Sequence, residues 1–177
     1  MNICCDLYPY CSARGPLGDA RRILDGFLAL TADGSVARAR CVSVGAVLAV
    51  MQSDFAVAVP MADESLRIGH ESRNAELVAP GSGAVLFTAY YLRNKSEDEL
   101  LSLAEALIGY GRSAGLPYLV ALGLGYVCAI RMSQGALDKA IESGKQAASS
   151  SAKWTLTIHE ARGVLRLLRA KPRLCEI

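Results

Sequence analysis

The pattern of apolar residues in the first part of the chain predicts one helix followed by two strands. Apolar side chains recur at helical spacing over residues 17–28, and this stretch ends before the turn dipeptide Asp33-Gly34. Residues 42–50 are apolar at both odd and even positions, so both faces would be apolar, as in a central strand. Residues 55–59 resume the strand pattern after a short polar break, so the two stretches predict an antiparallel hairpin.

The middle of the chain contains the clearest helix start. Residues 61–83 are mostly polar and predict a loop, and residues 84–92 predict a third strand. Ser96 and Glu99 then form a capping box, in which each side chain can bond the backbone amide of the other residue. An apolar stripe rich in leucine continues this helix, and residues 118–130 predict a further strand.

Two helices, over residues 133–144 and 157–168, complete the predicted order α-β-β-β-α-β-α-α. We found no internal repeat and no second domain. The prediction is an α+β fold with a mixed or antiparallel sheet of four to five strands and helices packed on it. Residues 1–16 show no period and predict an irregular arm, and residues 17–177 predict a single domain.

Composition places the chain among globular proteins. It has 177 residues, of which 52% are hydrophobic and 20% charged, with a formal net charge of +2. That length can bury a substantial core without disulfides, and so small a net charge indicates no particular partner. The charge-free run from Ser113 to Ile130 contains Pro117, and its continuous apolar part is shorter than the roughly 20 residues of a membrane-spanning helix. No secretory signal pattern opens the sequence, so we expect a cytoplasmic protein.

The candidates for chemistry are few. Cys41 and His70 could form a nucleophile and base, but nothing around Cys41 resembles a catalytic motif. We therefore favour no catalytic residue and expect no cofactor. Cys4, Cys5 and Cys11 lie close together, but the pattern lacks the paired spacing of a zinc site, so we predict no metal.

A basic stripe lies near the C-terminus. Arg162, Arg166 and Arg169 share one side of the last predicted helix, opposite an apolar face that we expect to pack on the body of the protein. Such a stripe could bind an anionic partner, either nucleic acid or a membrane surface. An ordinary solvated helix face is the favoured interpretation.

The order of predicted elements resembles that of the class I type III secretion chaperones, small dimeric proteins that hold bacterial effectors before export. The resemblance covers about residues 17 to 154 and includes Trp154, which follows the helix with Leu137 and Ile141. It implies a homodimer formed by the Leu-rich helix. The implied interface residues are Leu100, Leu103, Leu107 and Ile108.

The favoured function is therefore a non-catalytic binding protein that holds an extended segment of a partner protein, in the manner of a secretion chaperone. Two alternatives stay open. One is a small enzyme that uses Cys41 and His70, and the other is a virulence or viral accessory protein that acts by binding.

Overall fold

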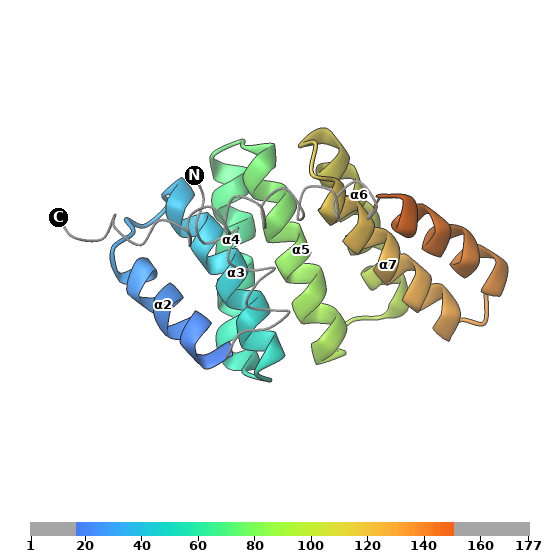
Figure 1. Ribbon diagram of the computed structural model, residues 1–177, viewed down its shortest axis with the longest axis horizontal. Coiled ribbons are helices and arrows are strands. Elements are labelled where there is room, and N and C mark those ends of the chain that lie inside the picture. The colour runs from blue at the N-terminus through green and yellow to red at the C-terminus, as the bar shows by residue number, and fades with distance from the viewer. Residues whose placement is uncertain (1–16, 151–177) are drawn as a thin grey trace, which may run out of the picture.

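The structure, a computed structural model, describes residues 17–150, and this part of the chain is helical and contains no strand (Figure 1). The predicted α+β fold with a sheet is therefore wrong. Residues 137–150 form the last described helix. Before it come α2 (Leu17–Ala29), α3 (Val36–Met51), α4 (Phe55–Glu71), α5 (Ala75–Leu92), α6 (Glu97–Ser113) and α7 (Pro117–Ser133).

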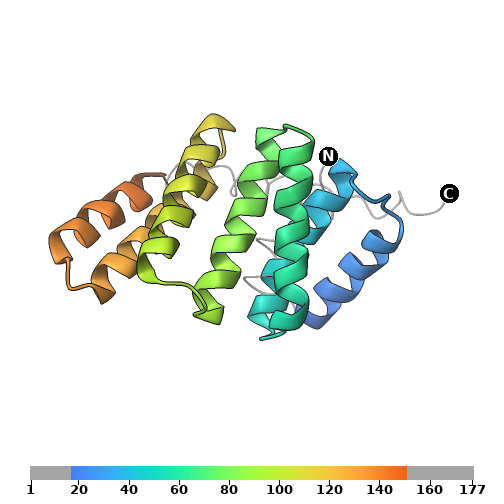
Figure 2. The ribbon, with the colours of Figure 1, turned by 180° about the vertical axis from the view of Figure 1, so that it is seen from behind.

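The helices stand side by side in two layers, and consecutive helices are antiparallel (Figures 1 and 2). In one layer, α3 contacts α5 and α5 contacts α7. In the other layer, which holds α2, α4 and α6, the backbones lie farther apart, and each helix packs on its sequence neighbours. Alternate helices run in the same direction, so the C-terminal ends of α3, α5 and α7 lie at one edge of the array. This is a solenoid-like arrangement, in which the core extends along the stack.

Each turn between helices contains one residue with a left-handed backbone, and these residues recur about every twenty positions. Glycine, which adopts this conformation without a steric penalty, occupies three of the turns. The six residues are Gly34, Ser53, Arg73, Arg93, Gly115 and Gly135. The described part of the chain is thus a regular alternation of helices and short turns.

The predicted strands fall in helices because those helices lack a polar side. Residues 41–51, 77–92 and 117–130 contain no Asp, Glu, Lys or Arg, and they make up most of α3, α5 and α7. α3 packs against α2, α4 and α5, so residues all around it are buried. An apolar run of this kind cannot be distinguished from a central strand by periodicity alone.

Prolines and glycines inside helices account for the predicted loop over residues 61–83. Pro60 lies within α4 and Pro80 within α5, although proline usually ends a helix. The predicted loop therefore consists of the second half of α4, a short turn and the first half of α5.

Amphipathic helices were predicted correctly. The helix expected over residues 17–28 is α2, which buries Leu24. The capping box is confirmed: the Ser96 hydroxyl accepts the amide of Glu99, and the Glu99 carboxylate accepts the amide of Ser96 at 2.9 Å. The next predicted helix is present, but Ser133 ends α7 and does not open it.

Candidate protein-binding surface

Four aromatic rings gather near the C-terminal end of α5. Phe87 and Tyr91 lie one turn apart, with ring centroids at 4.8 Å, and the Tyr90 ring lies 5.5 Å from that of Tyr91. Tyr126 of α7 joins them, with its ring 4.8 Å from that of Tyr90 and 6.4 Å from that of Phe87. We call these four residues the aromatic edge.

The aromatic edge is partly open to solvent. Tyr91 is 54% exposed, whereas Tyr126 is buried. The neighbouring helices of the layer end in large apolar residues as well, since Met51 of α3 is 37% exposed and Met132 of α7 is 59% exposed. Phe87 and Tyr90 are half-buried beside Tyr91, so this aromatic cluster is partly exposed. A partly exposed cluster differs from the single exposed apolar residues that occur on any protein surface, and it is typical of an interaction site.

The two layers differ in charge. α3, α5 and α7 carry charged residues only near their ends, as the three uncharged stretches above show. The outer sides of α4 and α6 are charged: Asp63 and Arg67 are exposed on α4, and Glu105 and Arg112 are exposed on α6. We call α3, α5 and α7 the apolar layer and the layer that holds α4 and α6 the polar layer, although this second layer also exposes three apolar residues in or just after α2, which are Ile23, Phe27 and Leu30. The aromatic edge belongs to the apolar layer.

Cys41 and His70 lie in different surroundings. Cys41 is buried on α3, where it packs with Leu24 of α2 and with Leu48. His70 is exposed on α4, and its ring lies 6.2 Å from that of Tyr110 in α6. Cys41 thus packs beside α2 and His70 lies beside α6, and neither contact joins the thiol to the imidazole.

The residues expected at a dimer interface lie mostly inside the chain. Leu100, Leu107 and Ile108 are buried, and Leu103 is partly buried against the same core. Leu100 and Leu107 pack in one cluster with side chains of α5 and α7. These three buried side chains already serve the fold of a single chain and present no surface to a second copy.

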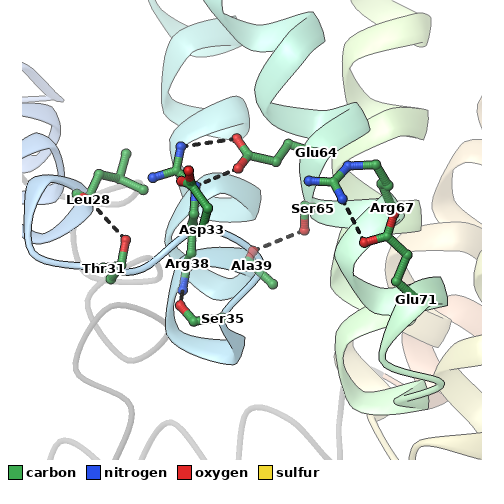
Figure 3. A network of polar contacts seen from close by, with 10 residues as sticks. All are labelled: Leu28, Thr31, Asp33, Ser35, Arg38, Ala39, Glu64, Ser65, Arg67 and Glu71. Atoms are coloured by element: carbon green, nitrogen blue, oxygen red, sulfur yellow. Dashed lines mark hydrogen bonds and ion pairs between the residues drawn. The ribbon is translucent and has the colours of Figure 1, made fainter.

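The polar contacts of α3 and α4 hold the array together (Figure 3). Arg38 Nε lies 2.5 Å from the Glu64 carboxylate and 3.5 Å from that of Asp33. The hydrogen bond to Glu64 raises the pKa of Arg38, although burial acts in the opposite direction. The buried Ser65 hydroxyl donates to the carbonyl of Ala39 at 3.0 Å. Each of these contacts joins α3 to its neighbours, and none leaves a reactive group open.

Within residues 17–150 we find no group of three or more His, Cys, Asp or Glu side chains able to hold a metal ion. A shallow depression of about 420 Å³ is lined by Lys95, Asp98, Glu99, Ser102 and Leu103. No helix in the described part of the chain is long and apolar enough to cross a membrane.

Three predicted features lie outside the described residues. They are the irregular arm over residues 1–16 with Cys4, Cys5 and Cys11, the Trp154 of the family resemblance, and the helix over residues 157–168 with its basic stripe of Arg162, Arg166 and Arg169 and the apolar face behind it. All three stay predictions.

The aromatic edge was missed by sequence reasoning because residues 84–92 were assigned to a strand. In a strand, Phe87 and Tyr91 would be two side-chain repeats apart, whereas in a helix they are adjacent. The i, i+3 and i+4 spacing of Phe87, Tyr90 and Tyr91 was the available signal.

Comparison of this chain with protein-family models, with curated proteins and with solved structures found no match.

Proposed function

We propose that this chain is a non-catalytic protein-binding scaffold that holds a segment of a partner protein against its apolar layer. The observation that carries the proposal is the aromatic edge, where an exposed Tyr91 contacts other rings at the end of an uncharged helix layer. The resemblance to secretion chaperones rested on strands that the described residues lack, so it does not support this proposal.

Aromatic side chains are suited to this role. They bury a large area with few rotatable bonds, and tyrosine is enriched among the residues that dominate binding energies. Covering apolar surface stabilises a complex by about 25 cal/mol per Å². Helices that are joined by short turns and packed in a stack lose little conformational freedom on binding, which favours affinity.

Site-specific crosslinking in cells tests this function. A photoreactive amino acid is placed at Tyr91 or Met132 in the apolar layer, and at the exposed Glu105 of the polar layer as the matched control. We expect discrete protein adducts from the first two positions and none from Glu105. Equal labelling from both layers, or no adduct from the apolar layer, would contradict the proposal.

We also propose a homodimer, as the sequence predicts. It requires a surface other than the buried side of α6. α2 offers one: Ile23, Phe27 and Leu30 are spaced at i, i+4 and i+7, and Leu30 is 85% exposed. Light scattering on the purified chain tests the dimer, and Phe27→Asp should then shift the mass to that of a monomer. A monomeric mass for the unmodified chain at high concentration would remove the dimer from the proposal.

We also propose that the protein acts in the cytoplasm. Cys128 is a free thiol, as expected in a reducing compartment. Fractionation of cells that express the tagged chain tests this location.

A further inference from the structure

Arg93 lies beside the aromatic edge in an unusual backbone conformation. It is the C-cap residue of α5, two positions after Tyr91, with φ of 53° and ψ of 35°. Its amide donates to the carbonyl of Ala89 at 3.1 Å, which ends the helix. The side chain is exposed. Arg93 therefore places an exposed guanidinium group at the same end of α5 as the ring cluster.

Arg93 has no ion-pair partner among the described residues. The other two cations near this end of the array are engaged: the Arg131 guanidinium of α7 donates to the amide oxygen of Gln134 at 2.9 Å, and Lys95 lies 3.9 Å from the Glu99 carboxylate. The Arg93 side chain therefore stays open to an external anion.

The acids closest in sequence serve other contacts. Glu97 accepts the Ser133 hydroxyl at 2.8 Å, and Glu99 accepts both the amide and the hydroxyl of Ser96. Asp98 lines the shallow depression on α6. All three occupy the first turn of α6, where the helix dipole favours negative charge.

We propose that the partner segment carries an acidic side chain that binds Arg93, next to an apolar side chain that packs on Tyr91. This inference rests on the proposed function and names the chemistry of its partner. A guanidinium group can bind a carboxylate through two parallel hydrogen bonds, which fixes orientation as well as charge. The aromatic edge supplies contact area, and Arg93 selects an acidic-apolar segment over a basic one.

The backbone of Arg93 makes an unusually clean test possible. L-residues adopt the left-handed conformation at a cost, so glycine at this position keeps the turn while it removes the side chain together with its charge. Arg73 is the matched control because it has nearly the same φ, 51°, is exposed, and pairs with no described carboxylate. It lies in the turn between α4 and α5, at the opposite edge of the array from Arg93.

The experiment measures the binding of two short fluorescein-labelled peptides by fluorescence anisotropy. Both have the same Leu and Phe pattern, and they differ in carrying either Glu or Lys at the flanking positions. We expect the Glu peptide to bind more tightly. Arg93→Gly should weaken it about fivefold, whereas Arg73→Gly should have no effect. High salt should remove the difference between the peptides. Both variants should unfold at a temperature no lower than that of the unmodified protein.

Tyr91→Ala separates this inference from the proposed function, because it should weaken both peptides equally. Equal binding of the Glu and Lys peptides, or equal losses in Arg93→Gly and Arg73→Gly, would overturn the role of Arg93 and leave the scaffold proposal standing. Failure of both peptides to bind would contradict both proposals. A single-stranded oligonucleotide whose binding depends on Arg93 would show that the anion is a phosphate and overturn the inference of an acidic protein segment.

Discussion

The crossing of α4 and α5 depends on two glycines that have no room for a side chain. A Cβ atom on Gly81 would lie 2.8 Å from both the N and Cα atoms of Leu66 in α4. A Cβ atom on Gly69 would lie 2.8 Å from the backbone nitrogen of Val78 in α5. These neighbours are backbone atoms and cannot rotate away. Gly81→Ala must therefore move the two helices apart.

The cost of that movement can be estimated from lost packing. Carbon atoms in contact prefer about 3.5–4.0 Å, so the helices must separate by roughly 0.7 Å or more, which forfeits about a quarter of each dispersion contact. Ile68 and Leu77 are almost completely buried in one cluster that spans these helices. A buried side chain of this size makes about 50 contacts of roughly 0.15 kcal/mol, so the two lose about 3–4 kcal/mol. Alanine has a higher helix propensity than glycine and stabilises the helix by about 1 kcal/mol, so the free energy of unfolding should fall by about 2–3 kcal/mol.

Gly109 and Gly125 provide the controls. They lie in α6 and α7, and a Cβ atom on either would have no heavy atom within 4 Å. Alanine there should stabilise the protein by about 1 kcal/mol through helix propensity. Urea unfolding followed by far-UV circular dichroism measures all three variants. If Gly81→Ala were as stable as the two controls, the close crossing of α4 and α5 would be wrong.

Three further predictions concern polar groups. Among the described residues, the buried Thr88 hydroxyl has no hydrogen-bond partner, so Thr88→Val should raise the free energy of unfolding by about 1 kcal/mol. The buried Ser65 hydroxyl donates to the carbonyl of Ala39, so Ser65→Ala should lower the free energy of unfolding by about 1 kcal/mol. Thermal unfolding of the two variants should shift in opposite directions. Ser96→Ala should cost about 1 kcal/mol as the loss of an N-cap. Hydrogen bonds from the Ser96 amide and hydroxyl lower the pKa of Glu99 in the folded state. The ionised Glu99 therefore stabilises the fold at pH values above the pKa of the unfolded chain, and this stabilisation is lost as the pH falls through the pKa of the folded state. The stability difference between the unmodified protein and Glu99→Gln should therefore shrink between pH 7 and pH 3, and a difference that is constant with pH would contradict this assignment.

The sequence predicted those helices whose two sides differ. α2 and α6 have one apolar side and one polar side, and the capping box marks the start of α6. α3, α5 and α7 could not be assigned from periodicity because their apolar positions point in every direction. Local start signals were available instead: Ser35 and Asn74 accept backbone amides at the starts of α3 and α5, and Pro117 occupies the first turn of α7. Each also exceeds the usual length of a strand.

The binding surface could not be predicted for a related reason. The surface depends on α5 and α7 lying side by side. Their packing brings the ring of Tyr126 against that of Tyr90, although the two residues are more than thirty positions apart in the sequence. Pattern reasoning instead selected Leu100 and Leu107 as an interface, because an apolar stripe looks the same whether its partner is another chain or the next helix. Only the packing of α6 on α5 and α7 shows which partner is present.

The lack of charge that hid α3, α5 and α7 also bears on function. Folding requires apolar residues where these helices face α2, α4 and α6, but it places no such demand on a side chain that is half exposed. Tyr91 has that position, and polar residues would serve the fold there equally well. Its contacts with Phe87 and Tyr90 make it part of a ring cluster, and so distinguish it from a single exposed apolar residue. The aromatic edge is thus more apolar than the fold of the apolar layer requires. Binding of a partner segment supplies a physical reason for this excess of apolar surface.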